Sequence, residues 1–183
     1  MLLVNKRIDQ GRGLAPTLLR RAATVQLDWD VRCKSRFDAT DSTGRHLGVF
    51  LPRGSVVRGG DVLVADDGSL VRVVAAAQPV LRVTACPEHG TARDLPRAAY
   101  HLGNRHIALE VRADQLQLEP DPVLAQMLRA MHLIVVELSA PFEPEGGAYG
   151  QVGSAAAHDH AHGHSHDHAH DHSHDHAHDH GHR

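Results

Sequence analysis

The fold is decided by a stretch of eighteen residues, 121–138, that reads DPVLAQMLRAMHLIVVEL. Asp121 followed by Pro122 is typical of a helix start, because aspartate caps free N–H groups and proline fits the first helical position. The apolar side chains that follow repeat with helical spacing and line one face; they are Val123, Leu124, Met127, Leu128 and Met131. The segment from Leu133 to Leu138, which begins with the apolar run 133–136, then predicts a strand.

The segment before this stretch predicts the same kind of order. We expect a strand over residues 80–84. Asp94 is a possible N-cap of a following helix, and Gly103 is expected to end that helix as its C′ residue. Two alternating segments, 108–111 and 116–118, predict two further strands. Together with the helix and strand of 121–138, the order is β-α-β-β-α-β, which is that of the ferredoxin-like unit.

The N-terminal part has a different pattern, with short strands and no helical period. Apolar and polar residues alternate over 25–29, and further strands are expected at 46–51, 61–65 and 70–74, the last two flanking a turn. This spacing predicts a small sandwich or barrel. We therefore expect an α+β protein with an all-β domain over 1–77, a hinge at 75–79 and a ferredoxin-like domain over 78–150.

Composition excludes several classes of protein. Segment 154–183 holds five Asp and one Arg, so the formal charge of −3 leaves residues 1–153 at about +1, and nucleic acid is not an expected partner. The longest apolar run, 133–136, cannot span a bilayer. Only two cysteines and no secretory signal fit a reducing cytoplasm, and the chain has none of the common catalytic motifs, so we expect no enzyme.

Histidine is the strongest chemical signal, with 18 residues in 183. Thirteen of them alternate along a tail, 151–183, that we expect to be disordered because it has no large aliphatic residue after Val152. They are His158, His160, His162, His164, His166, His168, His170, His172, His174, His176, His178, His180 and His182. Such a chain binds Ni, Zn, Cu or Co without imposing a geometry. The alternatives are a merely solvated run or a purification tag, although tags are usually contiguous histidine.

Five histidines lie outside the tail. We expect His46 and His132 to be structural. Cys86 and His89 form a Cys-x-x-His pair that can supply two ligands, but no second pair stands at finger spacing. His101 and His106 flank the predicted end of the first helix, where Gly103 lets the chain turn and His106 is presented at a surface corner.

Two motifs resemble a known family. The stretch YHLGNRH, residues 100–106, resembles the signature of the urease accessory proteins called UreE. The stretch PFEPEGGAY, residues 141–149, resembles the segment that closes that family's folded region, which a histidine-rich tail often follows.

The resemblance implies a nickel metallochaperone for urease. It implies a peptide-binding type of β domain, and a homodimer formed through the ferredoxin-like domain, with one metal ion held between two copies of His106. The implied partners are apo-urease and a GTPase accessory protein. Some relatives carry two further histidines before the second helix; residues 119–123 hold none here.

Two other functions stay open. A metal storage or detoxification protein would use the tail alone, with Ni, Zn, Cu or Co as its load. A general peptide-binding chaperone would work through the β domain and be indifferent to the tail and to His106.

Overall fold

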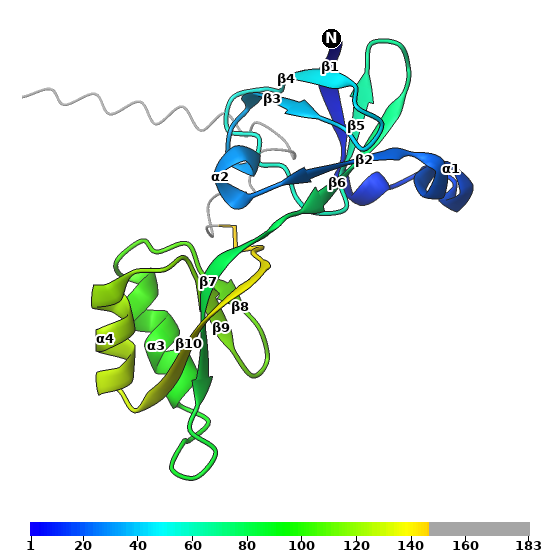
Figure 1. Cartoon of the computed structure of the whole chain (residues 1–183). Coiled ribbons are helices and arrows are strands. Elements are labelled where there is room, and N and C mark those ends of the chain that lie inside the picture. Colours follow the sequence, from blue (N-terminus) through cyan, green and yellow to red (C-terminus); the bar gives the residue numbers. More distant parts are fainter. Residues whose placement is uncertain (147–183) are drawn as a thin grey trace, which may run out of the picture. The chain divides into compact units, whose positions relative to one another are not determined.

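A computed structural model gives the structure of residues 1–146 (Figure 1). The elements in chain order are β1 (Leu2–Ile8), a 3-10 turn (Asp9–Gly11), α1 (Pro16–Arg21), β2 (Ala23–Leu27), α2 (Trp29–Arg32), β3 (Arg36–Thr40), β4 (His46–Phe50), β5 (Val62–Ala65), β6 (Leu70–Ala75), β7 (Ala77–Ala85), α3 (Asp94–Gly103), β8 (Glu110–Val111), β9 (Leu116–Leu118), α4 (Pro122–Ala130) and β10 (Leu133–Pro141). The predicted disorder and the histidines of 151–183 lie outside the described residues.

The first sheet has six strands in the order β2-β6-β5-β1-β4-β3. Its inner face packs a cluster of buried aliphatic side chains that includes Val4, Leu47 and Val71. The edge strand β2 is joined to the turn after β3, because the N–H of Ser42 donates to the Thr24 carbonyl at 2.7 Å. The sheet therefore curls so that its two edges approach each other at this point.

The first sheet also differs from the sequence prediction. Trp29 was expected in a strand but begins the short helix α2, because the Asp28 side chain accepts a hydrogen bond from the Val31 N–H and caps a helix there. The segment expected as a hinge, 75–79, is almost all strand: β6 ends at Ala75, and β7 begins at Ala77 and pairs with β10 from its first residue. The missed helices α1 and α2 have six and four residues, too few to display a helical period.

The second sheet confirms the ferredoxin-like prediction. Its strands run in the order β10-β7-β9-β8 and all pairings are antiparallel. Helices α3 and α4 lie side by side against this sheet (Figure 1). Buried side chains from sheet and helices form a second cluster, in which Leu81, Leu102 and Leu128 take part. The chain is thus α+β, as expected.

The helix starts were predicted with mixed success. Asp121 caps α4 as expected, since its carboxylate accepts hydrogen bonds from the N–H groups of Val123 and Leu124, both at 2.8 Å. The Asp94 prediction is wrong. Arg93 is the N-cap of α3, and the Asp94 carboxylate instead accepts from the N–H and the hydroxyl of Thr91, at 2.6 and 2.9 Å.

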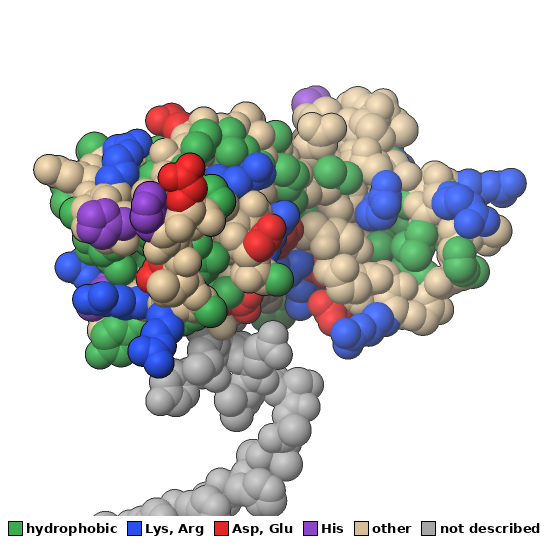
Figure 2. All heavy atoms as spheres, turned by 90° about the horizontal axis from the view of Figure 1, so that it is seen from below, with side chains coloured by type: hydrophobic (Ala, Val, Ile, Leu, Met, Phe, Trp, Pro, Cys, Tyr) green, Lys and Arg blue, Asp and Glu red, His purple; other side chains and the backbone are tan. Residues whose placement is uncertain are grey.

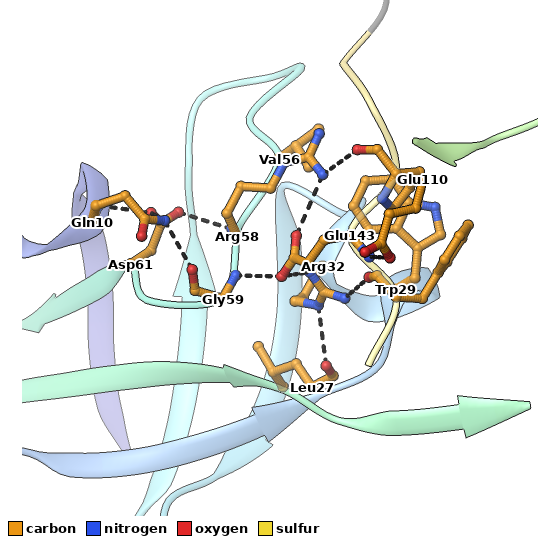
Figure 3. A network of polar contacts seen from close by, with 12 residues as sticks. Gln10, Leu27, Trp29, Arg32, Val56, Arg58, Gly59, Asp61, Glu110 and Glu143 are labelled. Atoms are coloured by element: carbon orange, nitrogen blue, oxygen red, sulfur yellow. Dashed lines mark hydrogen bonds and ion pairs between the residues drawn. The ribbon is translucent and has the colours of Figure 1, made fainter. Parts of the chain in front are cut away.

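The segment that follows β10 is fastened by a polar network (Figure 3). Arg32 has no exposed surface, and its guanidinium donates to the Glu143 carboxylate at 2.7 Å and to the Phe142 carbonyl at 2.6 Å. The same carboxylate accepts from the Gly59 N–H at 2.7 Å, while the Glu143 N–H donates to Glu110 at 2.8 Å. Residues 142–145 therefore contact α2, the loop before β5 and strand β8 of the second sheet.

Among the described residues, no helix is long and apolar enough to cross a membrane. Lysine and arginine side chains are spread over the face in Figure 2, among apolar and acidic side chains, and do not form one basic stripe. This distribution agrees with the near-neutral charge of residues 1–153.

Candidate metal centre

His106 closes helix α3. After Gly103 the chain makes two hydrogen bonds that define a Schellman ending: the Ile107 N–H donates to the Leu102 carbonyl at 3.2 Å, and the His106 N–H donates to the Gly103 carbonyl at 2.9 Å. Ile107 then packs on the apolar cluster to which Leu102 belongs. His106 therefore occupies the C′ position, where the backbone must be left-handed.

The backbone of His106 is indeed left-handed, with φ of 56°. This corrects the sequence prediction, in which Gly103 was the C′ residue; Gly103 is still helical, and the turn comes three residues later. Glycine is the usual residue at C′, and a side chain in this region costs on the order of 1–3 kcal/mol. Residues held in such conformations cluster at functional sites, so the histidine is a candidate for function on structural grounds.

The surroundings of His106 are open. His106 and its neighbours Asn104 and Arg105 are exposed, while His101 is half-buried on the last turn of α3. The Arg105 guanidinium donates to the His101 carbonyl at 2.9 Å, and the His101 ring meets the Tyr100 ring edge-on at 5.5 Å between centroids. The imidazole of His106 is thus open to solvent, whereas the His101 ring lies against Tyr100.

Exposed apolar side chains stand at the same end of the helix pair. Strands β7 and β9 are antiparallel, so the helices that follow them run in opposite directions and the end of α3 lies beside the start of α4. Tyr100 near the end of α3 is 66% exposed, and Val123 at the start of α4 is 72% exposed. Both side chains therefore present apolar surface to solvent at this end of the helix pair.

A second pair of ligand-type side chains lies after β7. Cys86 Sγ stands 3.7 Å from His89 Nδ1, and the Gly90 N–H donates to the Cys86 carbonyl at 2.7 Å, which closes the loop as a single turn. The contact with His89 lowers the pKa of Cys86, and backbone N–H groups of His89 and Glu88 lower it further. In contrast, burial raises the pKa of Cys33, the other cysteine.

The remaining histidines are separate. His46 is on β4, where its Nδ1 contacts the Thr40 hydroxyl at 3.2 Å, and His132 follows α4 with a φ of 62°. Within residues 1–146, no three histidine, cysteine or acidic side chains stand close enough to hold one ion. Within residues 1–146, a single chain therefore supplies one exposed histidine ligand at the end of α3, namely His106. The tail histidines lie outside the described residues.

Sequence reasoning missed the Arg32–Glu143 network. The two residues are 111 positions apart, and neither belongs to a spacing pattern. The only signal was the charged and proline-rich stretch at 141–145, which is unusual directly after a strand.

The chain matches two family descriptions along most of its length. Residues 4–76 match "UreE urease accessory protein, N-terminal domain", and residues 78–172 match "UreE urease accessory protein, C-terminal domain". A protein of Paracidovorax citrulli named urease accessory protein UreE is 75% identical over 149 residues, 81% of this chain and 71% of the relative. A protein of the same name from Albidiferax ferrireducens is 69% identical over 87% of this chain and 91% of its own length. A third protein of this name, from Burkholderia lata, is 52% identical over 87% of this chain and 74% of its own length.

Proposed function

The chain belongs to the UreE family of urease accessory proteins, and from this premise we propose that it carries nickel to apo-urease as the metal centre of urease is assembled. It has an accessory role in relation to urease and no catalytic activity of its own. Its partners are apo-urease and the GTPase accessory protein, in the cytoplasm. Residues 1–77 serve as the partner-binding domain and residues 78–150 as the metal-binding and dimerisation domain.

The observation that carries this proposal is the backbone of His106. A glycine would close α3 at lower cost, yet the position holds an exposed imidazole with φ of 56°. Neutral imidazole is a good ligand for Ni²⁺ and also for Zn²⁺, Cu²⁺ and Co²⁺, which are the expected competitors. The two backbone hydrogen bonds of the Schellman ending hold this ligand on a rigid element.

A homodimer would complete the site. A two-fold contact brings identical residues together, so two copies of His106 can share one ion on the axis. The exposed Tyr100 and Val123 at this end supply apolar surface for such a contact. Two imidazoles leave coordination positions open, and an open site passes its ion to a partner more readily than a closed one.

The thirteen tail histidines supply the ions. Because they are tethered to the same chain, their local concentration at the His106 site is high. An unspecific reservoir beside an under-coordinated transfer site suits a protein that must both collect and release nickel. His101, which packs against Tyr100, is a secondary contributor.

A metal storage protein is the second candidate, favoured by the tail alone. A store needs only to load and release, whereas a chaperone needs its partner and its transfer site. Loss of His106 would leave a store intact, because the tail retains nearly all of the metal capacity.

Titration calorimetry with Ni²⁺ tests the metal sites. We expect the full chain to bind several ions per dimer, and a chain ending at Gly153 to remain dimeric and bind about one ion per dimer by two-fold sharing. Replacing His106 with alanine in the shortened chain should abolish that ion, while His101→Ala should weaken it only slightly. Nickel binding by the shortened chain that is unchanged by His106→Ala would overturn the assignment.

A further inference from the structure

The first sheet has an open seam between its two edge strands, β2 and β3. Within residues 1–146 no ladder joins these strands, although their ends meet where the Ser42 N–H donates to the Thr24 carbonyl and the Thr24 N–H donates to the Ser42 hydroxyl. A hollow of about 220 Å³ lies at this point, lined by Thr24, Gln26, Thr40, Asp41 and Ser42. We call this hollow and the two strand edges that border it the seam.

The edge of β3 carries unused backbone hydrogen-bonding groups. In an antiparallel pair, alternate residues bond to the neighbouring strand and the residues between them point their N–H and C=O groups away from it. The Asp41 N–H donates to the Arg45 carbonyl, so the odd-numbered residues of β3 face β4. The backbone groups of Arg36, Asp38 and Thr40 therefore point away from β4, and within residues 1–146 they have no hydrogen-bond partner. Such an edge is a template for a further strand.

The edge of β2 offers the same groups across the seam. Thr24 directs both its N–H and its C=O away from β6, and the same direction follows for Gln26 two residues later, whose backbone groups have no partner in the described part of the chain. One extended segment in the seam can bond to β3 on one side and to β2 on the other, which closes the sheet into a barrel. The edge of a folded sheet, including β3 of a second copy, already has a neighbour on one side and cannot do this.

The core is incompletely covered beside the seam. Phe37 and Ala39 of β3 pack against the apolar cluster but are only half-buried. Their partners on β4, Val49 and Leu47, have no exposed surface. Side chains alternate between the two faces of a strand, so a segment in the seam points every second side chain inward beside Phe37 and Ala39. Aliphatic residues at these positions would complete the core.

The outer face of β3 sets the charges that a segment in the seam should carry. Arg36, Asp38 and Thr40 are exposed, and within residues 1–146 neither Arg36 nor Asp38 forms an ion pair. Opposite charges on directly facing residues of two strands stabilise their pairing, and like charges weaken it. A segment antiparallel to β3 therefore fits with a basic residue opposite Asp38 and, two residues later, an acidic residue opposite Arg36.

We propose that the seam binds a short extended segment of a partner protein, with aliphatic side chains pointing inward, a basic side chain opposite Asp38 and an acidic one opposite Arg36. The backbone bonds to both edges supply affinity, and the two charges supply specificity. This inference rests on the partner-binding role proposed for residues 1–77, and it gives that role a location and a class of ligand.

Amide hydrogen exchange of the full chain, followed by nuclear magnetic resonance, tests the seam. The probe is the blocked peptide TVKVE, in which lysine faces Asp38 and glutamate faces Arg36. In the chain alone, we expect slow exchange at Phe37 and Ala39 and fast exchange at Asp38 and Thr40, which the peptide should slow by about tenfold. Unchanged exchange at the highest soluble peptide concentration would overturn the proposal. Slow exchange at Asp38 and Thr40 without peptide would also overturn it, because another part of this chain or a second copy would then fill the seam.

Peptide affinities, measured by fluorescence polarisation, test the assigned chemistry. The control peptide TVEVK has the same composition and net charge, so attraction to the tail is equal for both. We expect TVKVE to bind about 2–10-fold more tightly than TVEVK, and the double variant Arg36→Glu, Asp38→Lys to reverse this preference. Methylation of the lysine and glutamate N–H groups, which face β3, should weaken binding of TVKVE by about tenfold.

Equal binding of the two peptides, an unreversed preference in the double variant, or tight binding of the methylated peptide would each contradict the proposal. Slow exchange at Phe37 and Ala39 in the double variant verifies that β3 still pairs with β4. These readouts involve neither nickel nor urease. Their failure would refute the seam as a binding site, whereas the nickel titrations of the His106 variants decide nickel delivery separately.

Discussion

The guanidinium of Arg32 donates to the carboxylate of Glu143 over 2.7 Å, although the two residues are 111 positions apart and Arg32 has no exposed surface. The planes of Arg32 and Arg58 also lie near the Trp29 ring, at 5.3 and 4.9 Å from its centroid. A buried charge is tolerated only when it is paired and hydrogen-bonded. This network thus helps to hold residues 142–145, which follow β10, in place.

Replacing Glu143 with alanine should lower the free energy of unfolding by about 2–4 kcal/mol, because it leaves the Arg32 charge buried and unpaired. The lower part of this range is expected since the Glu143 side chain is 32% exposed and water can enter. Urea denaturation measures the effect. Glu145→Ala is the matched control, because Glu145 is exposed and uses only its backbone N–H, which donates to Leu109. Equal stability of the two variants would contradict this account.

Asp41 should make the first sheet sensitive to acid. Burial raises the pKa of its carboxyl, but hydrogen bonds from Thr43 and Arg45 outweigh burial and hold the pKa well below its usual value. Because the pKa of this carboxyl is lower in the folded chain than in the unfolded chain, its ionised form stabilises the fold at pH values above the unfolded-state pKa of about 3.9. This stability is lost as the pH falls through the folded-state pKa.

Substitution of Asp41 by asparagine should therefore cost about 1–2 kcal/mol at pH 7 and should flatten the stability profile below about pH 4. Unfolding by urea at a series of pH values measures both effects. Asp67→Asn is the control, because hydrogen bonds from Ser69 lower its pKa but its side chain stands in an exposed turn. A profile for Asp41→Asn that is parallel to that of the unmodified chain would refute this role.

The ferredoxin-like order was predictable from sequence because its elements carry local signals. The apolar stripe of α4, its Asp121 cap and the run that forms β10 are each encoded within a few neighbouring residues. The six-stranded sheet was predicted only as short strands, because its order, including the parallel pairs β1–β4 and β2–β6, depends on contacts far apart in sequence.

The candidate site was predicted in position but not in conformation. Sequence reasoning placed His106 at a surface corner, but assigned the turn to Gly103 because glycine is the usual C′ residue. The actual turn depends on where Ile107 reaches the apolar cluster, which is a tertiary contact. The pairing of Arg32 with Glu143 could not be predicted from sequence either, because it is also a tertiary contact.

His106→Gly should raise the free energy of unfolding of the metal-free protein by about 0.5–1 kcal/mol, because glycine adopts the left-handed backbone without strain. His106→Asn should be close to neutral, since asparagine tolerates this region. Both should lose the shared ion. Urea midpoints and nickel titrations on the same samples check this; a destabilised glycine variant would mean that the imidazole stabilises the fold.

The pH dependence of nickel binding should separate the tail from the rest of the chain. Protons compete with metal for imidazole, and an imidazole with an ordinary pKa of about 6.5 is roughly three-quarters neutral at pH 7 and only a few per cent neutral at pH 5. Ions that need several tail imidazoles should be released steeply between these values. The measurement is nickel bound per dimer against pH, for the full chain and for a chain ending at Gly153. Superposable curves would show that the tail does not bind through imidazole.

The central claim is that His106 transfers nickel to urease. It is tested most directly by urease activity in cells that lack this protein, at limiting nickel, complemented with the unmodified chain, His106→Asn or His101→Ala. We predict that the unmodified chain restores activity, that His101→Ala restores most of it, and that His106→Asn restores little while added nickel rescues it. Full activity with His106→Asn at limiting nickel, or full activity with no complementing protein at all, would contradict the account.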